Sequence, residues 1–404
     1  MAHVSDPPAA EDLAATAHEF MEAVVLPDER DRPGGASVSR GKVKELRQAA
    51  RDYGIYAPQI DEAHGGMGLD FRTVLPAFEE AGRSRLGATA MRVDAPDEGN
   101  MHLIELAGDD LQKEQYLEPL VAGELRSGFS MTEPAPGAGS DPKMIRTTAE
   151  RDGDEWVIDG HKWWTTQGLE ADLLLVFART DQDVHPYEGC SVFLVPADAP
   201  GVNVIRNIPH LGGETDIGHA EIKYEGVRVP EEHLLGAEGE GFSLVQQRLG
   251  PARLTHCMRY SGMAMRALDI AKAYVRDREA FGGTLAEKGA IRHRVADAET
   301  RLHAVRTMVR NAADLIAAGE EARVEVAMSK VFTAEVVGDA VDLAVQCCGG
   351  NGIARDLPLA EFYERVRPFR IVDGADEVHR RTIARAAFED VPMEELAPVV
   401  RYGE

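Results

Sequence analysis

The spacing of apolar residues divides the chain into three stretches. From Ala10 to about Gly128, apolar residues recur three to four positions apart, which predicts helices. From Met131 to about Gly236 the pattern changes to short β-rich runs separated by Gly, Pro and Asp, which predicts strands. After Gly236 the helical period returns in segments long enough for a bundle. We therefore expect an α+β fold with an N-terminal helical domain, a middle antiparallel β domain and a C-terminal helical bundle.

The same patterns predict the individual elements. Helices are expected at Leu46–Tyr53, Val74–Ala81, Met101–Ala107, Leu111–Val121, Phe242–Arg278, Ala290–Ala318, Val324–Cys348 and Ala375–Phe388. Strands are expected at Trp156–Ile158, Leu173–Phe177, Ser191–Val195, Val202–Ile205 and Ala220–Tyr224. A chain of this length is too long for one ordinary core. We place the three domains at residues 1–128, 129–238 and 239–404.

Composition narrows the classes of function. The formal net charge of −25 opposes binding to nucleic acid, which needs a basic face. The apolar run Leu173–Ala178 is too short to cross a membrane, for which about 20 residues are needed. The first residues lack the pattern of a secretory signal, so we expect a cytoplasmic protein. The four cysteines lack the spacing of metal ligands, and we expect free thiols and no metal site.

Two segments carry groups suited to binding a cofactor. The segment 128–141, GFSMTEPAPGAGSD, combines hydroxyls, exposed amides and glycines that could wrap a polar ring and a phosphate. Taken alone, it could equally be an ordinary entry into a β domain. The segment 160–168, GHKWWTTQG, places Trp164 two residues before Thr166, so that both face one side of a strand. A flat ring could stack on Trp164 and form a hydrogen bond with Thr166.

Taken together, these motifs resemble the acyl-CoA dehydrogenase family. TEP is followed by GSD and, about thirty residues later, by Trp-x-Thr. The resemblance continues in PQIDEAHGGMGL at 58–69, VRVP at 227–230, REAFG at 278–282 and QCCGGNG at 346–352, in the family's order. QRLGPARLTHCMR and VDGADEVH are most similar to the subgroup that includes the acyl-CoA dehydrogenases 10 and 11 of animals.

The resemblance implies an FAD cofactor and its binding residues. Those expected to contact the cofactor within the subunit are Phe129, Met131, Thr132, Ser140, Trp164, Thr166, Ala375 and Glu377. Those expected to serve the flavin pyrophosphate of a neighbouring subunit are Arg278, Phe281, Gln346 and Gly350, which implies a homodimer or homotetramer. Ser140 would also contact the substrate, as would Arg253.

The chemistry requires a carboxylate that removes the α proton of a thioester and a donor for the enolate oxygen. Asp373 occupies the position where much of the family carries its catalytic Glu. It is one methylene shorter, which sets its carboxylate back by roughly 1.5 Å. The alternative location of the base in the family is Ala252 here, so Asp373 is the predicted base. His379 and Glu377 could bind polar groups of a substrate, although a role in capping the helix is favoured.

The expected function is FAD-dependent α,β-dehydrogenation of an acyl-CoA thioester to trans-2-enoyl-CoA, as in fatty acid β-oxidation. Electrons would pass to an electron-transfer flavoprotein. One alternative is an oxygen-using oxidase or monooxygenase of the same fold. The chain lacks the extra C-terminal domain common in acyl-CoA oxidases, which disfavours this alternative. Another is a catalytically inactive flavin-binding protein, which the retained carboxylate of Asp373 disfavours.

Overall fold

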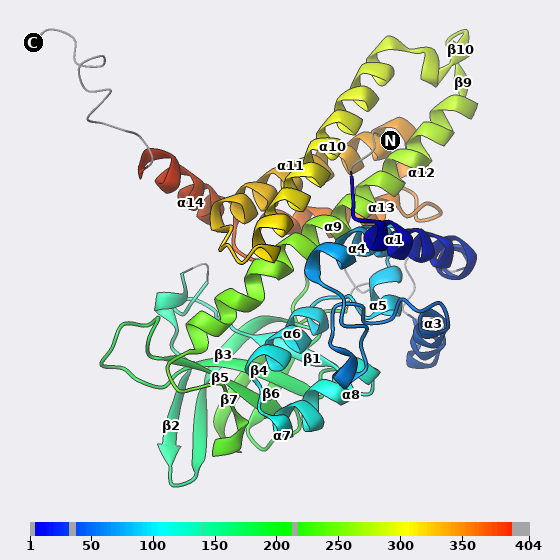
Figure 1. Ribbon diagram of the computed structural model, residues 1–404. Coiled ribbons are helices and arrows are strands. Elements are labelled where there is room, and N and C mark those ends of the chain that lie inside the picture. The colour runs from blue at the N-terminus through cyan, green and yellow to red at the C-terminus, as the bar shows by residue number, and fades with distance from the viewer. Residues whose placement is uncertain (1–4, 32–37, 140, 212–216, 390–404) are drawn as a thin grey trace, which may run out of the picture.

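The computed structural model describes residues 5–31, 38–139, 141–211 and 217–389. Helices form the first and third parts of the chain and enclose one end of a sheet formed by the second part (Figure 1). This arrangement confirms the predicted fold class. Within the described residues, no helix is both long enough and apolar enough to cross a bilayer.

The N-terminal part is built from short helices with capped starts. The Ser39 hydroxyl accepts a hydrogen bond from Lys42 N and so caps the start of one helix. The Asp70 carboxylate accepts one each from Arg72 N and Thr73 N and caps the start of another. The elements are α1 (Pro8–Phe20), η1 (Met21–Val25), α2 (Leu26–Arg30), α3 (Arg40–Asp52), η2 (Glu62–His64), α4 (Phe71–Gly82), α5 (Gly87–Met91), α6 (Asp97–Ala107), α7 (Asp110–Gln112), η3 (Lys113–Leu117) and α8 (Glu118–Ala122).

The middle part forms one sheet of eight strands. The strands are β1 (Ser127–Ser130), β2 (Thr148–Asp152), β3 (Glu155–Thr166), β4 (Leu173–Arg179), β5 (Cys190–Pro196), β6 (Val202–Asn207), β7 (His219–Pro230) and β8 (Leu234–Leu235). Their order is β6-β7-β3-β2-β4-β5-β8, and β1 pairs with β4. Most pairings are antiparallel, as predicted, but β1 and β2 each pair with β4 in parallel, so the sheet is mixed. Every residue of β4 is buried, which explains its continuous apolar run.

The C-terminal part is a bundle of long helices. Helix α9 (Gly241–Asp277) has 37 residues, a length of roughly 55 Å. In Figure 1 it runs from the sheet to a hairpin at the far tip of the bundle. The other elements are β9 (Glu279–Ala280), β10 (Gly283–Thr284), η7 (Leu285–Glu287), α10 (Gly289–Ala317), α11 (Arg323–Cys348), α12 (Gly350–Ile353), α13 (Leu359–Val366), η8 (Arg367–Arg370) and α14 (Asp376–Glu389).

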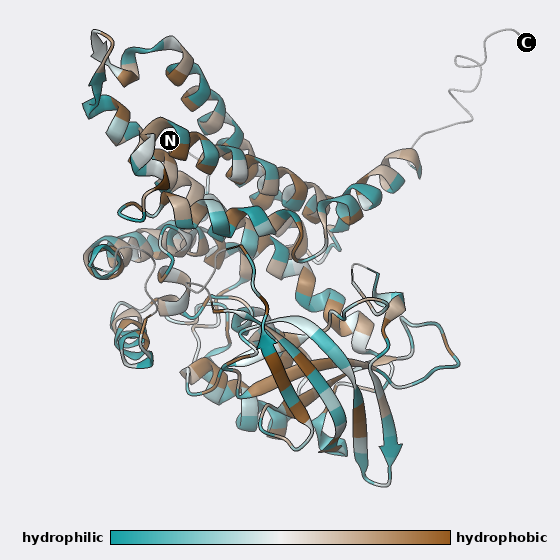
Figure 2. Cartoon of the chain, turned by 180° about the vertical axis from the view of Figure 1, so that it is seen from behind, coloured by the Kyte–Doolittle hydropathy of each residue, from teal (hydrophilic) through white to brown (hydrophobic). Residues whose placement is uncertain are grey.

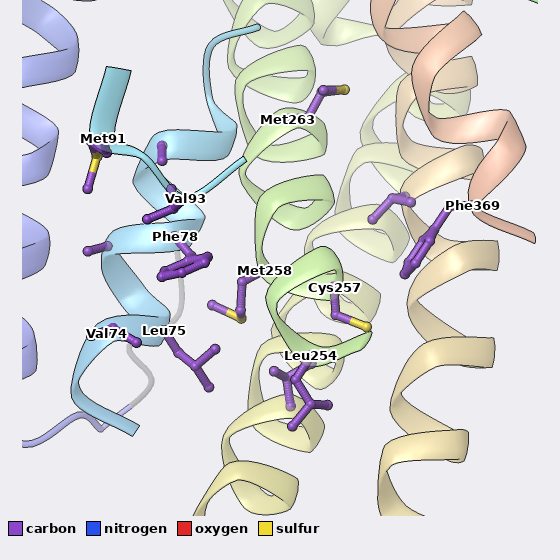
Figure 3. Close-up of a cluster of buried hydrophobic side chains, with 14 of the residues drawn as sticks. Val74, Leu75, Phe78, Met91, Val93, Leu254, Cys257, Met258, Met263 and Phe369 are labelled. Atoms are coloured by element: carbon purple, nitrogen blue, oxygen red, sulfur yellow. The ribbon is translucent and has the colours of Figure 1, made fainter. Parts of the chain in front are cut away.

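One core joins the two helical parts. It includes Phe78 of α4 and Met258 of α9, whose side chains lie between the two helices (Figure 3). The helices approach closely because each carries a glycine at the crossing. A Cβ added at Gly262 would lie 1.8 Å from Glu79 O, and one at Gly82 would lie 2.0 Å from Arg259 O. Because α4 is packed rigidly against α9 here, the sheet end of α9 has a fixed position.

Apolar residues also line both faces of the sheet. Strands β4 and β5 contribute alternate residues to the core shared with the helices and to a second core on the other face. The brown strands in Figure 2 show this apolar centre, with more hydrophilic residues toward the tips of the strands. The sheet is therefore a firm platform, on whose helix-facing edge the candidate site is built.

Candidate active site

The loop after β1 is held by strand β3. Lys162 Nζ donates a hydrogen bond of 2.8 Å to Met131 O, and Trp163 N donates one of 3.0 Å to Thr132 O. The carbonyl oxygens of Met131 and Thr132 therefore both accept hydrogen bonds from β3. Among the described residues, no partner is found for the backbone N–H of Met131 or Thr132. The loop thus presents two N–H donors from a fixed backbone, as expected for a segment that binds a polar ring.

A buried ion pair fixes the shape of this loop. The carboxylate of Glu133 accepts hydrogen bonds from Lys162 Nζ (2.9 Å), from Thr147 N and Oγ1 and from Arg146 N. Burial would raise the pKa of Glu133, but Lys162 and the Thr147 donors hold it below its ordinary value. Burial lowers the pKa of Lys162 to about 8, although Glu133 partly offsets this effect. Glu133, the glutamate of the TEP motif, therefore has a structural role, because its hydrogen bonds hold the loop in place.

Trp164 and Thr166 lie side by side, but not because of simple strand alternation. The register of β3 against β7 shifts between Lys162 and Thr165, and Trp164 has a φ of 55°. This bulge turns the indole outward, and 40% of Trp164 is exposed. Both residues contact His219: its Nδ1 lies 3.0 Å from Thr166 Oγ1, and its ring centroid lies 5.5 Å from that of Trp164. Trp164 and Thr166 therefore share one neighbour, His219, whose contacts hold both side chains.

Asp373 occupies a strained turn before α14. Its φ is 55°, a conformation that non-glycine residues adopt infrequently. Its carbonyl accepts hydrogen bonds from Arg253 Nε (3.0 Å) and His379 Nε2 (3.1 Å). Lys330 Nζ donates to the next carbonyl, that of Gly374, at 2.9 Å. Arg253 and His379 therefore hold the backbone of the candidate base, which favours the structural role for His379.

The Asp373 carboxylate is half-buried and lies among basic side chains. His256 Nδ1 lies 3.1 Å from Asp373 Oδ2, yet Oδ2 accepts no hydrogen bond among the described residues. The two observations agree because Nδ1 also lies 2.7 Å from Ala252 O, toward which its proton is directed. Burial would raise the pKa of Asp373, but His256, Arg248, Arg253 and Lys330 together hold it below its ordinary value. The carboxylate is thus ionised at neutral pH.

Arg248 links this turn to the loop after β1. Its guanidinium carbon lies 4.3 Å from the centre of the Phe129 ring, and its Nε donates to Asn100 Oδ1 at 3.1 Å. Its positive charge also lowers the pKa of Asp373. The structure therefore brings the predicted base near Phe129 in β1, the strand that leads into Met131 and Thr132, although the base is far from them in the sequence.

The other predicted residues lie elsewhere or are less informative. Phe281 is 94% exposed in the hairpin between β9 and β10, at the opposite end of α9 from the sheet (Figure 1). Arg278 directly follows the last residue of α9, Gln346 lies in the last turn of α11, and Gly350 begins α12. Ala375 precedes α14, and Glu377 is exposed in its first turn. Ser140 lies outside the described residues.

Sequence reasoning missed several residues that shape the site. These are Glu133, Lys162, His219, Arg248 and His256. One signal was available for His256, because it lies four residues after Ala252, the alternative position of the base, and so occupies the same face of a helix. No comparable signal in the sequence links Lys162 to Glu133, since their pairing depends on the register of β3.

The residues that are present fit a flavin. An exposed indole suits stacking against a flat ring, and the Thr166 hydroxyl contacts the same histidine, His219. Two backbone N–H donors, of Met131 and Thr132, have no partner among the residues that the structure describes. Met131, Thr132, Trp164 and Thr166 would hold the ring. The buried Oδ2 of Asp373 accepts no hydrogen bond from any described residue, as expected of a group that must accept a proton.

Comparisons with known proteins agree with this geometry. Residues 7–124, 128–227 and 239–388 match the family models described as acyl-CoA dehydrogenase N-terminal, middle and C-terminal domains. The chain is 40% identical over 377 residues to a probable acyl-CoA dehydrogenase FadE2 of Mycobacterium tuberculosis, covering 92% of each chain. It is 36% identical to acyl-CoA dehydrogenase family member 11 of Gallus gallus, where the match covers 85% of this chain and 44% of that protein.

Solved structures show the same fold. A putative acyl-CoA dehydrogenase from Mycobacterium abscessus superposes with a TM-score of 0.89 at 35% identity, covering 96% of this chain and 99% of that one. Butyryl-CoA dehydrogenase from Megasphaera elsdenii superposes with a TM-score of 0.85 at 27% identity, covering 96% and 100%. An FAD complex of PigA superposes with a TM-score of 0.85 at 25% identity, covering 96% and 99%. The chain is therefore an FAD-binding oxidoreductase that belongs to the acyl-CoA dehydrogenase family.

Proposed function

We propose that this enzyme converts an acyl-CoA thioester to trans-2-enoyl-CoA, with Asp373 as the base that takes the α proton. The observation that carries the proposal is the half-buried carboxylate of Asp373, which is held ionised and whose buried Oδ2 accepts no hydrogen bond from the described residues. A carboxylate in this state, beside the loop that fits the flavin, can take a proton without first losing a partner. Bound FAD would supply the acceptor for the β hydride.

The protein groups around Asp373 have separate tasks. Arg253 and His379 hold its carbonyl, so the turn keeps its strained backbone. The N–H of Asp373 itself would be available to an enolate oxygen of the substrate. Arg248 keeps a positive charge near both the base and the Phe129 ring, and its charge favours the ionised carboxylate before the proton arrives. Because these groups are polar or charged, the site suits a substrate with a polar thioester group better than a purely apolar one.

The assembly and the electron acceptor are further parts of the proposal. Phe281 is almost fully exposed on a hairpin that projects from the bundle, and a large apolar side chain so exposed suits contact with another subunit. We infer a homo-oligomer in which Arg278, Phe281, Gln346 and Gly350 serve the flavin of a neighbouring subunit. A protein whose solved structure is titled as an electron transferring flavoprotein of Acidaminococcus fermentans has a similar chain, at 30% identity and a TM-score of 0.86. This likeness supports an electron-transfer flavoprotein as the acceptor.

Thr166 is expected to affect the rate of flavin reduction more than FAD binding. In Thr166→Val the hydroxyl beside His219 is lost while the shape is kept. We expect FAD to remain bound and its reduction by acyl-CoA to slow about 5- to 10-fold, the effect of one hydrogen bond. Stopped-flow absorbance measures this rate. The control is Thr180→Val. It removes a hydroxyl that lies 2.9 Å from the Ser191 hydroxyl, just after the end of β4, and should leave the rate unchanged. Equal rates in all three proteins would remove Thr166 from the site.

The pH dependence follows from the pKa of Asp373. Because this pKa lies below the ordinary value of 3.8, the free enzyme carries an ionised base throughout the neutral range. A base must be unprotonated, so activity is lost only as pH falls through the folded-state pKa. We expect kcat/KM, which reports the free enzyme, to show no acid limb from this group above about pH 5. A limb near pH 6 to 7 that disappears in Asp373→Asn would contradict this account.

A direct test of the proposed function uses the purified enzyme with its FAD, without oxygen. Straight-chain, branched and hydroxylated acyl-CoAs are each mixed with it, and the visible flavin band is followed. We expect at least one class to bleach the band and to be converted to its 2-enoyl product. If the flavin were instead stable to all thioesters but reduced by another donor and reoxidised by oxygen with substrate oxidation, an oxygen-using enzyme would replace the proposal.

A further inference from the structure

His256 is the buried residue nearest to the Asp373 carboxylate, and the proposed reaction gives it no role. Its Nδ1 lies 3.1 Å from Asp373 Oδ2 and 2.7 Å from Ala252 O. Two oxygen acceptors this close to one nitrogen require that the nitrogen carry a proton, because a lone pair there would repel both. The geometry thus assigns the tautomer with a proton on Nδ1 and a lone pair on Nε2.

The ring is held firmly. It stacks against Phe369 with a centroid distance of 6.1 Å and an interplanar angle of 19°, and it lies 6.2 Å from the Tyr260 ring. Phe369 is fully buried and itself contacts Tyr260 at 4.6 Å. Figure 3 shows Phe369 on the side of α9 that carries Cys257, the residue after His256. Such packing leaves the imidazole little freedom to turn away from the carboxylate.

The charge on His256 is set by its surroundings. Burial lowers its pKa, and the Asp373 carboxylate offsets this only in part, so the ring is neutral at neutral pH. The charged groups that act on the pair come from three helices. They are Arg248, Arg253 and Arg259 of α9, Glu98 of α6 and Lys330 of α11. From α14, His379 contacts the Asp373 carbonyl and Asp376 pairs with Lys330.

We propose that His256 is a positioning residue for Asp373, an inference that rests on the proposed role of Asp373 as the base. His256 Nδ1 lies 3.1 Å from Oδ2, and the ring limits the rotation of the carboxylate. In the reaction the α C–H bond breaks, its proton forms a bond with a carboxylate oxygen of Asp373, and the electron pair stays on the thioester as the enolate. His256 neither gains nor loses a proton. It compensates for the shorter side chain of Asp by fixing its rotamer.

Substitution of His256 by asparagine or by glutamine distinguishes a positioning role from a packing role. In His256→Asn the side-chain nitrogen falls near the place of Nδ1, whereas in His256→Gln it falls near that of Nε2. We expect Asn to keep the limiting rate of flavin reduction within a few-fold of the original enzyme. Gln should slow it about 100-fold, because the carboxylate loses its orientation. FAD content and thermal unfolding of both variants are measured alongside, as a control for folding.

A second readout does not depend on activity. Infrared spectroscopy detects the C=O stretch of a protonated carboxyl, and the band that is missing from Asp373→Asn identifies Asp373. On acid titration of the holoenzyme, both His256→Gln and His256→Asn should show this band at a pH about one unit higher than the original enzyme, because each removes the imidazole whose charge lowers the pKa of Asp373.

The outcomes are distinct. If Asn and Gln slowed the rate equally and neither moved the titration, His256 would be a packing residue and the proposal would fail. If Asn were as slow as Asp373→Asn, Nε2 would itself be the base, which also overturns it. If no acyl-CoA reduced the flavin of the original enzyme, the proposed function would fail, while the titration would still decide whether His256 controls Asp373.

Discussion

Asp373→Asn is expected to slow the reduction of FAD by an acyl-CoA about 10²- to 10⁴-fold, which is the usual contribution of a general base. The amide keeps the size of the side chain and the carbonyl bonds to Arg253 and His379, but it cannot take the α proton. FAD should remain bound, because Asp373 does not form the loop that fits the flavin. The limiting rate of bleaching in stopped-flow absorbance measures the effect.

A matched aspartate separates this effect from a loss of charge. Asp152 is the last residue of β2 and pairs with Arg228 at 2.6 Å on the surface. Asp152→Asn should reduce its flavin as fast as the original enzyme. Asp373→Glu, which keeps the carboxylate, should retain a larger part of the rate than Asp373→Asn. A fast Asp373→Asn enzyme would move the base to another residue.

Lys162→Met is expected to lower the free energy of unfolding by about 3–5 kcal/mol, the usual effect of breaking a buried ion pair by removing one partner. Lys162 is fully buried, and without it the Glu133 charge remains in the interior. Met131 O also loses its donor, so the loop that fits the flavin should loosen and less FAD should copurify. Denaturant unfolding and the ratio of flavin to protein absorbance measure the two effects.

A double-mutant cycle isolates the pair. Lys162→Met combined with Glu133→Gln leaves no buried charge, so it should cost less than the sum of the two single substitutions. Arg228→Met breaks an exposed pair with Asp152 and should cost about 0–1 kcal/mol. If Lys162→Met were no more destabilising than Arg228→Met, the ion pair would not be what shapes the loop.

The helical and strand patterns were predictable because burial imposes its period on the sequence. The apolar rows of Val74–Ala81 and Val324–Cys348 became α4 and α11, and the continuous run at Leu173–Phe177 became the fully buried β4. The parallel pairing of β1 with β4 was not predictable, because the pattern within a strand says little about its neighbour. The motifs predicted that Trp164 and Thr166 face one side of a strand by simple alternation, whereas the structure has a bulge there and both residues contact His219.

The surroundings of the base could be predicted only in part. Asp373 was found through its motif, but its pKa depends on His256 and Lys330, which lie on two other helices. Nothing in the spacing of these residues shows that α9, α11 and the turn before α14 meet. The crossing of α4 and α9 depends on Gly82 and Gly262, two glycines among many, whose need for close approach appears only once the helices are packed.

The central claim is that this FAD-binding enzyme removes two hydrogens from the α and β carbons of an acyl-CoA. The most direct measurement is a single turnover without oxygen, in which flavin bleaching and the CoA product are followed together, the latter by mass spectrometry. The account predicts one equivalent of 2-enoyl-CoA, lighter by two hydrogens than its substrate, for each flavin reduced. Flavin that stays oxidised with every acyl-CoA of the panel, or bleaching without an enoyl product, would contradict it.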